Sequence, residues 1–184
     1  MSRLSKKIVL TFLFSVIIGS IFYWWTTSTQ TQNNDPCAFC NEQILQAQTF
    51  YEDNLVRGMC THKPLLPYHC LVVIKRHIEN IDNATDEEIA AAFRLIKKIN
   101  AIVQKLNGPS SYLLLQKNGR EAGQTVPHVH IHYLPTKQTD CRNTPTFGLL
   151  WPFIRSPFQR AIPKDVLAAD VAVMKKEFLM IGAA

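Results

Sequence analysis

The most regular pattern in the chain is the spacing of apolar residues between Thr85 and Gly108. Thr85 and Glu88 form a capping-box pattern at its start, and Gly108 provides a stop at its end. The apolar positions that recur at helical spacing are Ile89, Phe93, Ile96, Val103 and Leu106. This pattern predicts one long helix over residues 85–108 that packs one face against a core.

A different pattern, with a period of two, covers residues 126–135. The histidines His128, His130 and His132 alternate there with the apolar residues Val129, Ile131 and Tyr133. Successive side chains of a β-strand point to opposite faces, so the pattern predicts a strand with an imidazole face and an apolar face. A lone histidine is more often structural, but three on one face indicate a functional site.

Shorter apolar runs complete the predicted fold. Strands are expected at residues 54–60, 69–75 and 111–117, and an amphipathic helix that covers the domain is expected at 164–179. Residues 141–163 are expected to be irregular. The order of these elements and their hairpin-like connections predict an α+β fold, in which a long central helix and a C-terminal helix pack on an antiparallel sheet.

The N-terminal pattern is apolar without any period. Residues 8–25 are uncharged and mostly apolar, follow Arg3, Lys6 and Lys7, and end in aromatic residues. As a helix this stretch would be about 27 Å long, close to the thickness of a bilayer core. It predicts an uncleaved transmembrane signal anchor. The alternatives are a cleaved secretory signal, for which bulky aromatics stand where small residues are usual, and a buried helix, which would need a polar face.

These patterns divide the chain into three parts. We expect a membrane anchor over residues 1–26, a polar linker over 27–35, and one folded domain with a C-terminal extension over 36–184. By the positive-inside rule the folded domain would lie on the exported side, periplasmic or luminal.

Composition narrows the function. The chain has 184 residues, 47% of them hydrophobic, which is enough for one sizeable core. Of the formal charge of +6, three positive charges precede Asp35, so the remainder has 17 basic and 14 acidic residues. A balance of +3 suits a small polyanionic ligand and argues against a nucleic-acid polymer as partner. The odd count of five cysteines argues against a pure disulfide framework.

Two cysteines and two histidines form a candidate metal site. Cys37 and Cys40 are two residues apart in a C-x-x-C motif, and His77 and His128 can supply two imidazoles. Two thiolates and two imidazoles suit tetrahedral zinc and fill all four positions, which indicates a structural ion. C-x-x-C alone is a weak signal, and a disulfide or a redox pair remains open.

His130 and His132 are then left for chemistry. A neutral imidazole can attack phosphorus when donors hold the phosphate oxygens. The preceding loop offers such donors at Gly123, Gln124 and Thr125, because glycine lets the main chain approach a ligand closely. The alternative for this loop is an ordinary β-turn.

Several segments resemble one known family. "GQTVPHVHIHYL" matches the H-φ-H-φ-H-φ-φ signature of the histidine triad (HIT) family of nucleotide hydrolases and transferases, and "PYHCLVVIKRH" resembles its P-G-H-x-L-V-I-P-K-R-H segment. With "CAFC" and "FYEDN" the resemblance covers residues 37–135 and points to the zinc-bearing bacterial branch. It implies a HIT-like fold and, commonly, a homodimer.

The resemblance also implies roles for individual residues. His130 would be the nucleophile that takes up a nucleoside monophosphate, His132 its hydrogen-bonding support, and His69 a histidine near the phosphate. The substrate-binding candidates are Asn118, Gly123, Gln124 and Thr125. The zinc ligands of the bacterial branch correspond to Cys37, Cys40, His77 and His128.

Three positions depart from the family pattern. Thr61 stands where many members have an acidic residue that binds the ribose, Lys117 replaces the first asparagine of N-N-G, and Ile74 stands where proline is usual. Lys117 would favour a more anionic ligand, or it is an exposed lysine without a role. These departures concern the nucleoside more than the phosphate chemistry.

The expected function is that of a HIT-type hydrolase or nucleotidyl transferase with a histidine-nucleotidyl intermediate. Its substrate would be a nucleoside phosphoramidate or a dinucleoside polyphosphate. The alternatives are a nucleotide-binding sensor or scaffold with little turnover, and a metal-binding or redox protein.

Overall fold

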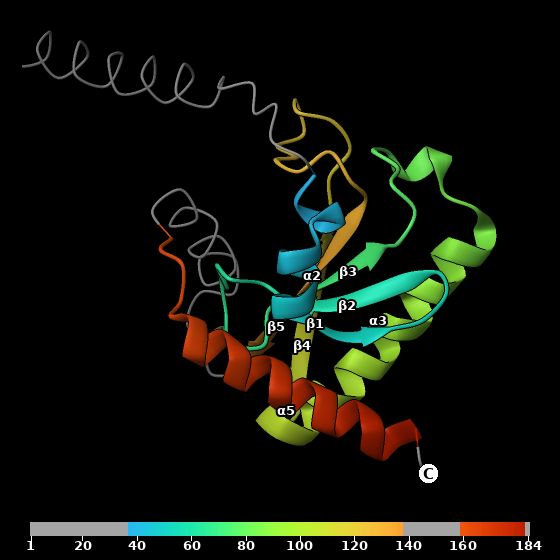
Figure 1. The fold of residues 1–184 in the computed structure, drawn as a ribbon. Helices are drawn as coiled ribbons and strands as arrows, with labels where there is room; N and C mark the ends of the chain where they lie inside the picture. The colour runs from blue at the N-terminus through green and yellow to red at the C-terminus, as the bar shows by residue number, and fades with distance from the viewer. Residues whose placement is uncertain (1–36, 138–158, 183–184) are drawn as a thin grey trace, which may run out of the picture. The chain divides into compact units, whose positions relative to one another are not determined.

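A five-stranded antiparallel sheet organises the fold (Figure 1). The computed structural model describes residues 37–137 and 159–182. In this part of the chain the strands lie in the order β1-β2-β3-β5-β4, and each neighbouring pair is antiparallel. Their bounds are β1 (Thr49–Glu52), β2 (Val56–Cys60), β3 (Cys70–Ile74), β4 (Ser110–Gln116) and β5 (His130–Lys137). The expected α+β class is confirmed.

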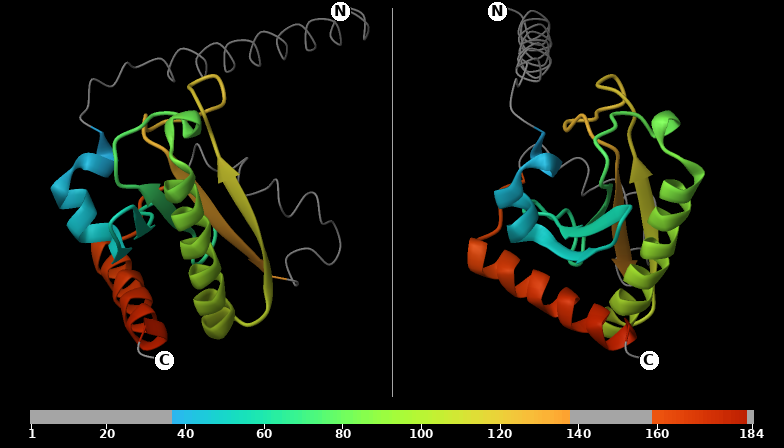
Figure 2. Two further views of the ribbon diagram at one scale, coloured as in Figure 1. Left: turned by 90° about the vertical axis from the view of Figure 1, so that its right-hand side faces the viewer. Right: turned by 45° about the vertical axis from the view of Figure 1, so that its right-hand side comes forward.

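Helices cover both faces of this sheet. The described helices are η1 (Ala38–Cys40), α2 (Glu42–Gln48), η2 (Ile81–Asn83), α3 (Asp86–Asn107) and α5 (Lys164–Gly182). Figure 2 shows α2 and α3 on opposite sides of the strands, with α5 running across the end of the sheet near β1. The sheet therefore has two buried faces.

The central strand β3 shows the consequence. Cys70, Val72 and Ile74 belong to the large core that contains α3 and α5, whereas Leu71 and Val73 belong to a smaller core with Phe39 and Leu45. Side chains of a strand alternate between faces, and here both faces are covered. This explains why β3 is a continuous apolar run instead of an alternating one.

The two-sided character predicted for the histidine strand is confirmed. His130 pairs with Val73 and His132 with Leu71, so the two imidazoles share a face with the smaller core. Ile131 and Tyr133 are buried in the large core.

The predicted start of this strand at residue 126 is wrong. The strand begins at His130, and His128 lies in a bend just before it. Pro127 has no N–H for a ladder, and the Val129 N–H donates to the Ile78 carbonyl.

The long helix α3 confirms the predicted capping box. The Thr85 side chain accepts from the Glu88 N–H, and the Glu88 carboxylate accepts from the Thr85 N–H. Arg76 also donates to Glu88, from Nε at 3.0 Å and from Nη2 at 2.8 Å. The start of the helix is thus tied to the chain that follows β3.

The buried face of α3 differs in part from the prediction. Phe93 is 48% exposed, and Ile89 is only half-buried. Ala91 and Ala92 contact the core instead. Small residues let a helix approach a sheet closely, and a pattern that counts only large apolar residues misses them. The buried positions are Glu88, Ala91, Ala92, Leu95, Ile96, Ile99, Ile102 and Val103.

The expected membrane localisation is contradicted. Within residues 37–137 and 159–182, no helix has an apolar run of sufficient length to cross a bilayer. The two longest helices, α3 and α5, both carry charged side chains among their apolar ones. Residues 8–25, on which the expectation rested, lie outside the described residues, as do most of residues 141–163. The domain boundaries 1–26, 27–35 and 36–184 stay predictions.

We predict that Thr85→Ala lowers the free energy of unfolding by about 1 kcal/mol, because the Glu88 N–H at the start of α3 loses the Thr85 hydroxyl that accepts its hydrogen bond. Urea unfolding of the full chain measures the difference. Thr85→Ser is the matched control, because it keeps the hydroxyl. Equal stability of the Ser and Ala variants would contradict the proposed contribution of the cap.

Candidate active site and metal centre

A cleft of about 250 Å³ lies beside the histidine face of the sheet. Its apolar lining comes from Ala38, Phe39, Ile44, Leu65, Leu71 and Val126. Its polar lining comes from Gln48, Thr61, His62, Lys63, Thr125 and Gln159. Three more histidines, His69, His130 and His132, also line it. The cleft thus joins an apolar wall to an array of imidazoles.

The backbone fixes the tautomer of His130. Its Nδ1 lies 2.7 Å from the carbonyl oxygen of His128. A carbonyl can only accept, so Nδ1 carries the proton and Nε2 keeps a free lone pair. Burial lowers the pKa of His130, which keeps the ring neutral at pH 7. His130 lines the cleft as a neutral ring, and its unprotonated Nε2 can act as a nucleophile.

A second chain of hydrogen bonds fixes His69 and His132. The Leu65 N–H donates to His69 Nδ1 at 3.1 Å, so the proton of His69 is on Nε2. This Nε2–H donates to His132 Nδ1 at 2.9 Å, which leaves the proton of His132 on its own Nε2. Mainly through burial, the pKa of His69 falls to about 4 and that of His132 to about 3. Both rings are therefore neutral, and His132 offers an N–H donor.

His130 and His132 are neighbours with complementary chemistry. Their ring centroids are 5.0 Å apart. The ring of Phe39 also packs against His130, with a centroid distance of 5.0 Å. One ring offers a lone pair and the next an N–H group. This arrangement can attack an electrophilic centre such as phosphorus and hold one of its oxygens at the same time.

Just before His69 the chain changes direction at Tyr68, which has a φ of 61°. This left-handed conformation favours glycine and costs a residue with a side chain about 1 kcal/mol. Tyr68 is also partly buried against the large core. Its packing offsets the strain and places His69 beside Leu65.

Of the predicted substrate-binding residues in the loop before β5, only some lie at the cleft. Thr125 lines the cleft, but Asn118, Gly123 and Gln124 are not among the residues of its wall. Both polar atoms of the Gln124 amide bind the backbone: Oε1 accepts from the Gly119 N–H at 2.7 Å, and Nε2 donates to the Glu79 carbonyl at 2.9 Å. In the free protein this amide therefore holds the loop together.

Asn118 and Gly123 are engaged in the same loop. The Asn118 Oδ1 accepts from the Ile81 N–H at 3.0 Å and from Gln116 Nε2 at 2.8 Å. Gly123 has a φ of 80°, and its carbonyl accepts from Lys117 Nζ at 3.2 Å. Lys117 is thus anchored to the loop before the histidines. The substrate-binding roles of these residues stay predictions.

Sequence reasoning missed several residues of the cleft. Phe39 lies inside the C-x-x-C motif. A large apolar residue between two candidate metal ligands could have indicated that it packs beside the site. No sequence pattern marked Gln48 or Gln159, because a single glutamine at the end of a short helix or in an irregular segment belongs to no recognisable pattern.

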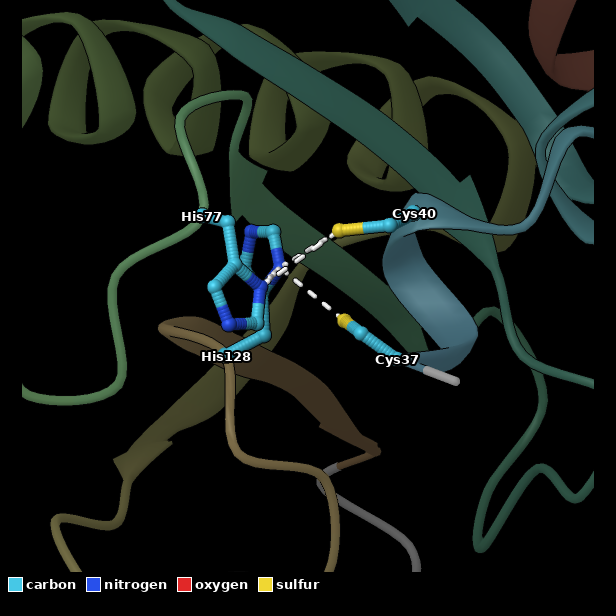
Figure 3. A group of neighbouring side chains, drawn as sticks. All are labelled: Cys37, Cys40, His77 and His128. Carbon is cyan, nitrogen blue, oxygen red and sulfur yellow. Dashed lines mark hydrogen bonds between the residues drawn. The ribbon is translucent and has the colours of Figure 1, made fainter. Parts of the chain in front are cut away.

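The four predicted metal ligands do come together (Figure 3). Their ligand atoms all lie within 4.8 Å of one another, although the residues come from η1 and the position just before it, the chain after β3 and the bend before β5. The Cys37 Sγ is 3.2 Å from His128 Nδ1, the Cys40 Sγ is 3.4 Å from His77 Nδ1, and the two Nδ1 atoms are 3.3 Å apart. Cys37 and Cys40 are both free thiols.

These distances fit a tetrahedral ion. Bonds of zinc to sulfur and nitrogen imply ligand–ligand separations of about 3.3 to 3.8 Å. The His128 Nε2–H donates to the Ile74 carbonyl at 2.6 Å, so its Nδ1 lone pair faces the cluster. A backbone acceptor on the second nitrogen is typical of histidines that bind metal.

The pKa of the Cys37 thiol is raised to about 11, mainly by burial and then by the neighbouring Cys40. A bound cation would oppose this effect.

Residues 42–139 match the family model described as HIT domain, which is more than half of the chain. The chain belongs to the HIT family. The expected family is therefore confirmed, whereas the zinc-bearing branch stays a prediction.

Similar proteins include two curated hydrolases. One is the bis(5'-nucleosyl)-tetraphosphatase of Schizosaccharomyces pombe, 34% identical over 51% of this chain and 52% of the relative. The other is the bifunctional bis(5'-adenosyl)-triphosphatase/adenylylsulfatase of Arabidopsis thaliana, 36% identical over 56% of this chain and 57% of the relative. The HIT protein described here thus spans only about half the length of each.

A solved structure supports the fold. The NitFhit protein of Caenorhabditis elegans superposes with a TM-score of 0.58 at 27% identity, over 71% of this chain and 27% of that protein. This likeness agrees with the match of residues 42–139 to the HIT domain.

We predict that the purified protein binds one divalent metal ion per chain at the Cys37, Cys40, His77 and His128 cluster. Replacement by Co²⁺ should give the absorption of a tetrahedral site with thiolate ligands. Cys40→Ser should weaken binding of the ion at least about tenfold, because one thiolate is lost. Cys60→Ala, a buried cysteine outside the cluster, is the control and should bind metal normally. Unchanged metal content in the Cys40 variant would contradict the assignment.

Proposed function

We propose that this HIT protein is a nucleotide hydrolase or nucleotidyl transferase that acts through a covalent His130 intermediate. The observation that carries the proposal is the tautomer of His130, whose Nδ1–H is bound to the His128 carbonyl at 2.7 Å while Nε2 is free. Its substrate is a nucleoside phosphoramidate or a dinucleoside polyphosphate. The names of the two curated relatives support the dinucleoside polyphosphate of this pair.

The first step is attack of His130 Nε2 on the phosphorus next to the nucleoside. A nitrogen–phosphorus bond forms, and the bond from phosphorus to the leaving oxygen or nitrogen breaks. The attacking ring becomes positively charged, and the His128 carbonyl that accepts from Nδ1–H stabilises this charge. The leaving group departs with its electron pair and takes a proton from solvent, and the water that attacks in the second step gives one proton back to solvent.

The donors around His130 hold the transferred phosphoryl group. The His132 Nε2–H is available as such a donor, because His69 donates to the other ring nitrogen of His132, Nδ1. The Thr125 hydroxyl lines the same cleft and can hold a second oxygen. Water then cleaves the nitrogen–phosphorus bond, which releases the nucleoside monophosphate and restores His130.

The metal cluster has a structural role in this proposal. Zinc would be held by Cys37, Cys40, His77 and His128, and its chemistry would be to bind their side chains in one fixed geometry. It would join η1, which carries Phe39, to the bend before β5. All four ligands come from the protein, so the site leaves no position for substrate.

The proposal includes a homodimer, which the family resemblance implies. β4 is an edge strand of the described sheet, and Tyr112 on it is 41% exposed. An exposed edge strand can accept a second copy of the chain.

A nucleotide-binding protein with little turnover is the second candidate. Thr61 lines the cleft at the position where an acidic residue was expected, which removes a charged contact to a nucleoside. This candidate predicts tight binding of nucleotides without release of product.

We predict that His130→Asn lowers turnover of an adenosine phosphoramidate or a diadenosine polyphosphate by a factor on the order of 10³ or more, because the nucleophilic nitrogen is lost. Release of AMP measures turnover. Rapid quenching of the wild type should also give a protein heavier by one nucleotidyl group.

Calorimetric binding of AMP is the control, and it should persist in the variant. Turnover that survives His130→Asn in a folded protein would overturn the mechanism. Binding of AMP without turnover in the wild type would favour the second candidate.

A further inference from the structure

Gln48 is a buried amide whose side chain has no hydrogen-bond partner among residues 37–137 and 159–182. It is the last residue of α2, is only 7% exposed, and lines the cleft. Its side chain lies at the wall of the cleft and is almost fully buried. Buried polar groups normally find a partner. A buried amide that lines a cleft and has no partner among the described residues is available to bind a ligand.

Gln159 reaches the same cleft from the other end of the chain. Its Nε2 donates to the Pro64 carbonyl at 2.8 Å, and the Ile162 N–H donates to the His62 carbonyl at 2.9 Å. These bonds hold the segment before α5 against the connection between β2 and β3. Among the described residues, the second N–H and the Oε1 of Gln159 have no partner and are available to a ligand.

The chemistry of the cleft limits the ligand. Phe39 and Ile44 offer an apolar wall, whereas Gln48, Thr61 and Gln159 offer neutral groups that both donate and accept. His130 lies in the same cleft. A nucleoside has the matching parts, because its base is flat and largely apolar on its faces and its ribose and base edge carry neutral donors and acceptors.

We propose that Gln48 and Gln159 recognise the neutral hydrogen-bonding groups of the nucleoside, so that the segment after the HIT domain completes the substrate site. Gln159 lies outside the matched residues 42–139. This inference rests on the proposed function, since it names what binds beside His130. It makes Gln48 and Gln159 specificity residues that touch the nucleoside and take no part in the bond changes at phosphorus.

Binding of AMP to full-length protein tests the inference by calorimetry, without turnover. Gln48→Leu and Gln159→Leu keep the size of the side chain but remove its hydrogen bonds, and each should raise the Kd for AMP about tenfold. Gln43→Leu is the matched control, because Gln43 is an exposed glutamine of the same helix. Its Kd should stay within about twofold of wild type.

Two further ligands distinguish the groups that are recognised. If an amide binds the ribose, 2'-deoxy-AMP should bind the wild type more weakly than AMP, and the Leu variant should lose this difference. If it binds the base, the Leu variant should lose the difference between AMP and GMP. Either result supports the proposal.

The proposal is overturned if both Leu variants bind AMP like the Gln43 control, or if the wild type does not bind AMP. Should Gln48→Leu fail to fold, Gln159→Leu and Gln48→Glu carry the test, because Gln159 is only half-buried and Glu keeps the size of Gln48. Loss of AMP binding in the variants of a wild type that has no turnover would support nucleoside recognition and refute the hydrolase proposal.

Discussion

The chemistry of this site depends on hydrogen bonds between buried imidazoles and backbone groups that can only donate or only accept. The Leu65 N–H sets the tautomer of His69, and the carbonyls of His128 and Ile74 set those of His130 and His128. A neutral imidazole carries only one ring proton, so a partner that fixes the state of one nitrogen also fixes the state of the other. The main chain thus decides which ring nitrogen keeps a free lone pair and which carries a proton to donate.

This constraint joins the two candidate centres. The Nδ1 of His128 faces the metal cluster, and the carbonyl of the same residue holds Nδ1 of His130. The sheet then places His132 on the same face as His130, where His69 from the end of the β2–β3 connection can reach it. His128 therefore links the cysteine–histidine cluster directly to the ring of His130.

Much of this arrangement could be predicted from the sequence, because local rules decide it. Period-two alternation separated His130 and His132 from Ile131 and Tyr133, and the capping box set the start of α3. Tertiary contacts decide the rest: Ala91 and Ala92 contact the core while Phe93 stays exposed, and Gln124 binds the loop instead of lining the cleft. Gln159 could not be found, because its place depends on contacts with residues far away in the chain.

The most direct test of the central claim is the ¹⁵N NMR spectrum of the histidine rings of the full-length protein. The expected result is a proton on Nδ1 of His130 and on Nε2 of both His69 and His132. The latter two should keep these states from pH 7 down to pH 5, because their pKa values lie at about 4 and about 3. A proton on Nε2 of His130, or a charged His132 at pH 7, would contradict the arrangement and with it the assignment of His130 as nucleophile.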